Sequence, residues 1–220
     1  MNKRPAPSDL LATSGRILDV AEGLAQTRGF NGFSYADIAA QLKITKASLH
    51  YHFATKADLG RALIMRYTEN FAAALALIDA ADAPNTLSRY VQLYEQLLVR
   101  DRMCLCGMLA AEYSTLPAAM QKELRGFFDT NERWLTETLE RARAAGALRF
   151  DGAGLEAART LTAGLEGAML LARSYGEPAR FSAIAQRLLA DLGVARPGVA
   201  RASRRASPAR RSVATRRASA

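Results

Sequence analysis

The feature that most constrains this chain is a run of helix starts between residues 34 and 59, SYADIAAQLKITKASLHYHFATKADL. Ser34 and Thr55 are each followed three residues later by an aspartate. This is the spacing of a capping box, in which a hydroxyl residue begins a helix and a carboxylate reaches back to it. Thr45 can cap a further helix between them. The spacing predicts two short helices joined by a tight turn, followed by the start of a longer helix.

The apolar positions give each short helix one inward face. Ile38 and Leu42 lie on the same side of the first helix, and Leu49 falls on the inner side of the second. The second helix then leaves these residues mostly outside: Lys46, Ala47, Ser48, His50 and Tyr51. Lysine neutralises phosphate, hydroxyl groups bond to phosphates or bases, and alanine is small enough to approach a thymine methyl. This exposed set suits the surface of a DNA duplex.

Capped helix pairs are also common in all-helical proteins that bind no DNA. The inference of DNA binding therefore depends on which residues occupy the helices. The informative residues are Gly29-Phe30, Ser34-Tyr35, Asp37-Ile38-Ala39, Lys46-Ala47-Ser48-Leu49, Tyr51-His52-Phe53 and Thr55-Lys56-Ala57-Asp58-Leu59. They resemble the N-terminal domain of the TetR/AcrR family of bacterial transcriptional regulators, over about residues 9 to 75. One position departs from the family pattern, because His50 stands where a tyrosine is common.

The resemblance implies an all-α fold with an N-terminal three-helix helix-turn-helix domain and a C-terminal helical domain for ligand binding and dimerisation. We expect the DNA-binding domain at residues 8–55, with family-like sequence to about 75, and the effector-binding and dimerisation domain at 56–195. The exposed surface and the resemblance together assign the DNA contacts to Ser34, Tyr35, Thr45, Lys46, Ala47, Ser48, His50, Tyr51 and Lys56. The expected partner is double-stranded operator DNA.

Helical periodicity continues through the rest of the chain. The positions of glycine and proline predict helices at about 8 or 13 to 28, 56–80, 86–101, 104–113, 117–145, 155–175 and 178–192. The long helix that begins at residue 56 is expected to end near Ala83-Pro84, because proline interrupts a helix.

The formal net charge of +9 says little about the folded part, because it is concentrated at one end. Residues 196–220 hold eight arginines and no acidic residue, so the remainder has 22 basic against 21 acidic residues. This Arg-rich tail has no apolar periodicity and is expected to be disordered. It either contacts phosphate regardless of base sequence or is a passive extension.

The sequence predicts a cytoplasmic protein with no membrane partner. No secretory signal follows Met1, and no apolar run approaches the ~20 residues that span a membrane. The two cysteines are only two positions apart and form no disulfide framework, which fits a reducing compartment.

The second-last predicted helix carries small residues on one side: Ala163, Gly164, Gly167 and Ala168. In the family that the chain resembles, the last two long helices of each subunit form a four-helix dimer interface, and the resemblance implies the same role here. Close packing within one chain is the alternative. A homodimer is expected in either case, because one short recognition helix covers too few base pairs for specific binding.

The central region, about 85–175, is rich in aromatic residues and methionine, as suits an apolar pocket for an unknown small-molecule effector. The candidate effector contacts are Tyr94, Met103, Cys104, Cys106, Met108, Trp134 and Met169. The same residues would also make an ordinary core. Arg100 and Arg102 could favour a thiolate at one of the two cysteines, which would then sense electrophiles or oxidants. Alternatively, both cysteines are small buried hydrophobic residues.

No metal site or cofactor is expected. The C-x-C pair lacks a second pair of ligands, and His50 and His52 point in different directions from one helix. No phosphate loop or nucleophile elbow indicates an enzyme. The sequence favours a transcriptional repressor released from its operator by an effector, with the helix that begins at Thr55 linking the two sites. The alternatives are a nonspecific nucleoid-type DNA-binding protein and a helical enzyme.

Overall fold

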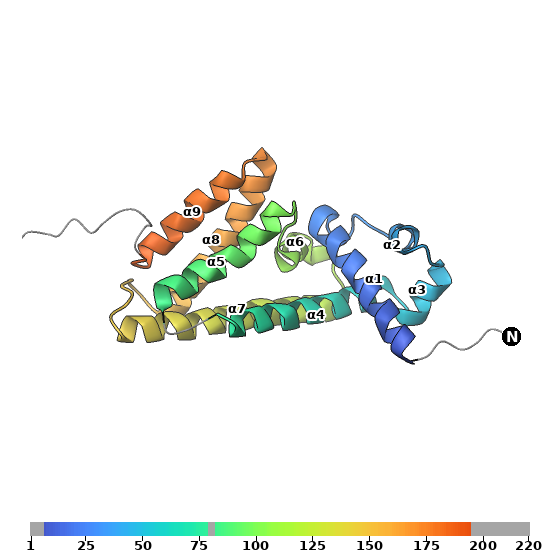
Figure 1. Ribbon diagram of the computed structural model, residues 1–220, viewed down its shortest axis with the longest axis horizontal. Coiled ribbons are helices and arrows are strands. Elements are labelled where there is room, and N and C mark those ends of the chain that lie inside the picture. Colours follow the sequence, from blue (N-terminus) through green and yellow to red (C-terminus); the bar gives the residue numbers. More distant parts are fainter. Residues whose placement is uncertain (1–6, 79–81, 195–220) are drawn as a thin grey trace, which may run out of the picture.

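The described part of the chain is built from helices (Figure 1). The computed structural model describes residues 7–78 and 82–194. Within these ranges the elements are α1 (Pro7–Arg28), α2 (Tyr35–Leu42), α3 (Lys46–His52), α4 (Lys56–Ala76), α5 (Ala83–Val99), α6 (Leu105–Ala111), the 3-10 turn η1 (Tyr113–Thr115), α7 (Ala118–Ala144), α8 (Gly154–Tyr175) and α9 (Pro178–Asp191). The prediction of an all-α fold is confirmed. The Arg-rich tail lies outside the described residues.

Both predicted capping boxes are present. The carboxylate of Asp37 accepts hydrogen bonds from the backbone N–H and the hydroxyl of Ser34, each at 2.7 Å. Asp58 does the same for Thr55, at 3.0 and 2.7 Å. Each box satisfies donors that a helix start leaves unpaired. Between α2 and α3, Lys43 adopts the left-handed conformation with φ of 54°, which ends α2 and lets the chain turn.

Pro84 begins a helix rather than ending one. The long connecting helix α4 already stops at Ala76, and Pro84 lies in the first turn of α5. The expectation that Pro84 marks the end of the connecting helix was therefore wrong. Proline is well tolerated in a first turn, because its missing N–H would have had no intrahelical partner there. Asp82 caps this helix by accepting a hydrogen bond from the backbone N–H of Asn85 at 3.4 Å.

The helices form two groups joined by α4 (Figure 1). α1, α2 and α3 lie at one end, and α4 leads away from them and packs along α7. α8 packs against both α7 and α9, while α5 contacts α8 and α9. Buried apolar side chains form one continuous cluster that runs from Ile17 and Ile38 in the first group to Phe127 and Phe181 in the second. The two groups therefore share a core.

A polar clasp holds the loop after α1. The carboxylate of Glu112, at the end of α6, accepts hydrogen bonds from the backbone N–H groups of Phe30 at 2.7 Å and Asn31 at 3.3 Å. On α8, Arg173 donates to the carbonyl oxygens of Gln26 at 3.0 Å and Thr27 at 2.6 Å. Both contacts tie the end of α1 to the larger helical group.

Candidate nucleic-acid interface and effector pocket

The outer surface of α3 presents most of the residues that the sequence assigned to DNA. Leu49 is completely buried and anchors the helix, while Lys46, Ala47 and His50 are exposed. Tyr51 is 66% exposed, although a ring of this size is usually covered. The Thr45 hydroxyl accepts a hydrogen bond from the backbone N–H of Ser48 at 3.1 Å, as predicted for the cap of this helix. The helix therefore offers a cation, a small methyl group and a phenol at one surface.

An open hollow of about 340 Å³ lies between the start of α2 and α3. Its lining residues are Phe33, Ser34, Tyr35, Ala36, Lys46, His50 and Lys56. The fold thus brings the predicted residues of α2, α3 and α4 together. Sequence reasoning missed Phe33 and Ala36, although both flank the Ser34–Tyr35 pair. A hollow beside a helix start offers backbone N–H groups as well as cationic side chains to an anion.

Tyr35 points into the protein, which corrects its assignment as a DNA contact. Its hydroxyl lies 2.9 Å from the carbonyl oxygen of Phe53 and 2.7 Å from that of Thr55, and it donates its proton to these acceptors. Burial, together with the nearby negative charge of Asp58, raises the pKa of Tyr35 to about 12, so the phenol stays protonated. The side chain spans the break between α3 and α4.

The ammonium group of Lys56 also forms its hydrogen bonds within the domain. Its ammonium donates to the carbonyl oxygens of Phe30, at 2.6 Å, and Phe33, and it lies 4.6 and 4.5 Å from the centres of their rings. Desolvation by burial lowers the pKa of Lys56, against the opposing effect of Glu112 and Asp37. Two of its three donors are therefore used internally. This corrects the assignment of Lys56 as a side chain free to bind phosphate; it mainly holds the loop in place.

His50 is oriented by the fold. Its Nδ1 lies 3.0 Å from the carbonyl oxygen of Ala54, and its ring lies 4.8 Å from that of Tyr35. A carbonyl oxygen can only accept, so Nδ1 carries the proton in this contact. His50 lines the hollow, and Nε2 is the ring nitrogen that this contact does not use.

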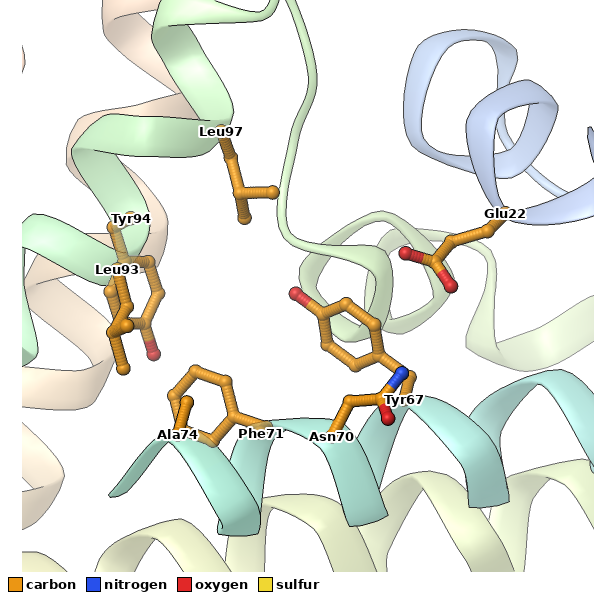
Figure 2. A pocket seen from close by; sticks show the side chains of 8 residues that line it. All are labelled: Glu22, Tyr67, Asn70, Phe71, Ala74, Leu93, Tyr94 and Leu97. Carbon is orange, nitrogen blue, oxygen red and sulfur yellow. The ribbon is translucent and has the colours of Figure 1, made fainter. Parts of the chain in front are cut away.

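A second cavity, of about 170 Å³, lies between α1, α4 and α5. Its lining comes from α1 with Glu22, from α4 with Tyr67, Asn70, Phe71 and Ala74, and from α5 with Leu93, Tyr94 and Leu97. Figure 2 shows these side chains placed around a common space, with the Glu22 carboxylate on one side, Phe71 and Tyr94 on the other, and the Tyr67 ring nearer to Glu22. The cavity is apolar except for one carboxylate, one amide and the phenol groups, as is usual for a small-molecule site.

Comparison with known proteins decides the family. Residues 17–63 match the bacterial regulatory proteins of the tetR family, and residues 85–188 match the tetracyclin repressor-like C-terminal domain. The transcriptional regulator AcuR of Cereibacter sphaeroides is 31% identical over 176 residues, which cover 77% of this chain and 80% of AcuR. The chain belongs to the TetR family.

Solved structures of other TetR-family regulators agree. One from Agrobacterium tumefaciens is 34% identical with a TM-score of 0.80, and the match covers 83% of this chain and 98% of that one. One from Legionella pneumophila is 32% identical with a TM-score of 0.75, covering 87% and 100%. As a TetR-family transcriptional regulator, the protein binds DNA through its N-terminal helix-turn-helix and carries a C-terminal ligand-binding domain.

Of the effector contacts predicted for this TetR-family regulator, only Tyr94 lines the cavity between α1, α4 and α5. The others are placed as core or near-core residues: Met103, Cys104, Cys106 and Met169 are buried, and Met108 and Trp134 are partly buried against the core. These six residues therefore do not line this cavity, and their surroundings agree with the alternative that they form an ordinary core. Glu22, Tyr67 and Phe71 were missed, because they come from helices that were assigned to other roles.

The two cysteines lie in surroundings that oppose thiolate formation. Burial raises the pKa of Cys104 and Cys106 well above the ordinary value, and the carboxyl of Glu166 raises both further. Arg102 instead donates to the side-chain oxygen of Gln26 at 3.4 Å. The expectation that nearby arginines activate these thiols was therefore wrong. The Tyr67 hydroxyl donates to the sulfur of Cys104 at 3.8 Å.

Glu166 is a buried carboxyl that the sequence analysis did not single out. Burial raises its pKa to about 7, although a hydrogen bond with the Cys104 thiol acts in the other direction. Its Oε1 has no hydrogen-bond partner among the described residues. No local pattern marks the residue, because its partner Cys104 lies far away in the sequence.

The four small residues of α8 divide between two surfaces. Ala163 is exposed, and a side chain at Gly167 would meet open space. Ala168 is only 2% exposed, and a Cβ atom at Gly164 would lie 2.6 Å from Leu188 on α9 of the same chain. Gly164 and Ala168 therefore serve packing within the subunit, which corrects their assignment to the dimer interface.

Residues 7–78 and 82–194 were also considered as a metal site and as a membrane anchor. No group of three or more His, Cys, Asp or Glu side chains in these ranges is arranged to hold a metal ion. None of their helices is long and apolar enough to cross a membrane.

Proposed function

We propose that this regulator is a homodimeric repressor that leaves its operator when a small molecule occupies the cavity between α1, α4 and α5. The observation that carries the proposal is the exposed surface of α3, which presents a cation, a small methyl group and a phenol to solvent. Lys46, Ala47 and Tyr51 supply these groups. The cytoplasm is the compartment in which such a protein would meet its operator.

In the complex, α3 enters the major groove. Ala47 and the side chains of Lys46 and Ser48 reach base edges or the adjoining phosphates, while Tyr51 and Nε2 of His50 bond to the backbone. Thr45 sits at the start of α3, where backbone N–H groups and the positive end of the helix favour a phosphate. Ser34 holds the same place at the start of α2. Tyr35 and Lys56 support this surface from behind.

Dimerisation would use the outer face of α8 with α9. Ala163, Gly167 and Leu171 follow one another at intervals of four residues, so they lie on one side of α8. Ala163 and Leu171 are exposed, and Gly167 has open space before it. Small residues beside exposed leucines allow two helices to approach closely and bury apolar surface. A two-fold dimer would then place two α3 helices about one DNA turn apart.

Release would act through α4. This helix contributes Tyr67, Phe71 and two other residues to the cavity, and it begins at Thr55, directly after α3. A ligand that fits only one position of α4 shifts the dimer toward a spacing of the recognition helices that does not match the operator. If the ligand bound the state that does not fit the operator about 5.5 kcal/mol more tightly than the state that does, it would reverse a 99:1 ratio of the two states.

The test is selection of random duplex DNA on the purified protein, followed by binding measurements with the selected sequence and with random competitor. A repressor should prefer its selected sequence by ~10³-fold or more. Lys46→Ala combined with Tyr51→Phe should weaken binding to the selected sequence and to random DNA alike, because both side chains contact the DNA backbone, while Lys122→Ala, an exposed lysine on α7, should leave both affinities unchanged. Equal binding to all sequences would show a nucleoid-type protein instead.

The enzyme alternative has less support, because the relatives at 30% identity or more are transcriptional regulators.

The role of the Arg-rich tail is tested by removing residues 196–220. The shortened protein should bind random DNA more weakly and show a flatter dependence on salt, while it keeps its selected sequence.

A further inference from the structure

We propose that the cavity between α1, α4 and α5 is built for a small organic cation of the alkylammonium class, held between one carboxylate and three aromatic rings. This inference rests on the proposed function, in which the same cavity takes the effector. It goes beyond that function by naming the charge and size of the ligand.

The first argument is charge. Arg66 on α4 bridges two carboxylates of α1, with Nη1 2.7 Å from Asp19 and Nη2 2.9 Å from Glu22. One cation against two anions leaves this cluster with a net negative charge. Glu22 is the member that lines the cavity, and no Lys, Arg or His among residues 7–78 and 82–194 does so. An anionic ligand would therefore meet no partner, whereas a cation would complete the charge balance.

The second argument is the arrangement of the rings. Phe71 lies 6.5 Å from Tyr67 and 6.3 Å from Tyr94, measured between ring centres, and all three line the cavity. Figure 2 shows Phe71 and Tyr94 across the space from the Glu22 carboxylate, with the Tyr67 ring nearer to Glu22 in this view. Aromatic faces attract cations, most strongly when the cation is already desolvated, and they suit an ammonium that carries methyl groups. Rings on some sides and a carboxylate on another are the combination that such a cation needs.

The third argument concerns Glu166, a buried carboxyl that interacts with two of the tyrosines that line the cavity. The buried carboxyl of Glu166 is near enough to raise the pKa of both Tyr67 and Tyr94, in addition to the larger effect of burial. Where Glu166 is ionised, at a pH above its pKa of about 7, an anionic ligand would add a further negative charge to this region. The volume of about 170 Å³ also favours a small molecule, since pockets for drug-sized ligands occupy ~300 Å³ or more.

Three probes of similar shape and different charge test the proposal: tetramethylammonium, tert-butanol and pivalate. Binding to the full-length protein is followed by ligand-observed NMR at constant ionic strength, which removes general salt effects. Trp134 supplies a second signal, because it is the only tryptophan and stacks on Tyr90, which in turn contacts Tyr94. We expect saturable binding of tetramethylammonium and at least ~10-fold weaker binding of the other two probes.

Variants locate the binding. Glu22→Gln keeps the shape of the side chain, and Phe71→Leu keeps an apolar group; each should weaken tetramethylammonium binding ~5-fold or more. Glu69→Gln is the matched control, since Glu69 is an exposed residue of the same helix α4 that does not line the cavity. Its binding should be unchanged. Glu22→Gln also removes one of the two ion-pair partners of Arg66. Asp19→Asn therefore serves as a second variant, because it removes a negative charge from the same cluster without changing a residue that lines the cavity.

Equal binding of the three probes, tighter binding of pivalate, or no saturable binding of tetramethylammonium would each overturn the proposal. So would an equal loss of binding in Glu69→Gln. The same protein samples are titrated with the selected operator. A sample that binds operator but not the cation refutes the ligand class and leaves the repressor proposal standing, whereas a sample without sequence preference refutes the repressor proposal itself.

Discussion

Glu112 and Phe30 join the two helical groups through a charged hydrogen bond, with the carboxylate of the first 2.7 Å from the backbone nitrogen of the second. Glu112→Gln keeps the shape but removes the charge that strengthens this bond. We expect the free energy of unfolding to fall by ~1–2 kcal/mol, measured by urea denaturation. Glu123→Gln is the control, because its pairing with Arg61 is at the surface and should contribute less than ~1 kcal/mol. Equal losses in the two variants would contradict the clasp.

The two tyrosines near α3 should respond differently to loss of the hydroxyl. Tyr35→Phe leaves two backbone carbonyls without their buried donor and should cost ~1–2 kcal/mol of stability, with weaker operator binding as a result. Tyr51→Phe should weaken operator binding and leave the melting temperature unchanged, because its side chain is exposed. Thermal unfolding and fluorescence anisotropy separate the two effects. A drop in stability with Tyr51→Phe would mean that its hydroxyl has a structural partner.

Lys46→Ala should weaken binding to selected and random duplexes by similar factors. The lysine is exposed on α3 and acts as a point charge on phosphate, so its loss should lower the slope of log K against log salt by about 1. Binding is measured at several salt concentrations. Lys122→Ala removes the same charge from α7 and should leave the slope unchanged. A change of preferred base in Lys46→Ala would show that the lysine reads sequence.

Glu166 makes stability depend on pH. Its pKa is about 7 in the folded protein, against 4.5 as the ordinary value. The folded state thus holds a proton that the unfolded state loses above pH 4.5. Below pH 4.5 Glu166 is protonated in both states, and its burial as a neutral group does not lower the free energy of unfolding. As the pH rises from 4.5 through 7 the unfolded state gains the more favourable ionised form, so the free energy of unfolding falls. Glu166→Gln stays neutral, so it should be more stable than the natural protein at pH 8 by up to about 3 kcal/mol.

Thermal unfolding of both proteins from pH 4.5 to pH 8 checks this prediction. The difference between them should vanish toward the acid end of the range. Carboxyl groups with a lowered pKa, such as Asp37 and Glu140, are present in both proteins and cancel in the comparison. A difference that stays constant with pH would refute the assignment to Glu166.

If the outer face of α8 forms the proposed dimer interface, Leu171→Glu should convert the dimer into a folded monomer, because it places a charge on that face. Leu77→Glu, at the end of α4, changes another highly exposed leucine and should leave the dimer intact. Sedimentation velocity measures the mass, and circular dichroism checks the helix content. A dimer that survives Leu171→Glu would place the interface elsewhere.

The sequence predicted features whose causes are local. The caps at Ser34 and Thr55 depend on a carboxylate three residues away, and the burial of Leu49 depends on spacing within one short helix. All the residues that determine such a feature lie within a few positions of one another. Helical periodicity alone predicts an all-α protein without its domain arrangement. The resemblance of the same stretch to the TetR family added the two-domain arrangement.

The errors arose where the partner lies far along the chain. Tyr35 and Lys56 looked exposed beside α3, but their partners are carbonyl groups on other segments. In the sequence Gly164 and Gly167 are equivalent small residues of one helix, but in the structure only Gly164 packs against Leu188 of α9. The cavity near Phe71 needed three helices that are separated in sequence. Side-chain direction in these cases is set by tertiary packing, which residue spacing does not contain.

The position of the Tyr35 hydroxyl between Phe53 and Thr55 has an evolutionary consequence. One proton donor serves carbonyl groups on both sides of the break between the recognition helix and α4, so the tilt of one helix is tied to the direction of the other. Substitutions that loosen this joint would lower both the grip on DNA and the response to effector. Operator affinity and inducibility would then not evolve independently in this protein, because selection on either one acts on the same hydrogen bonds.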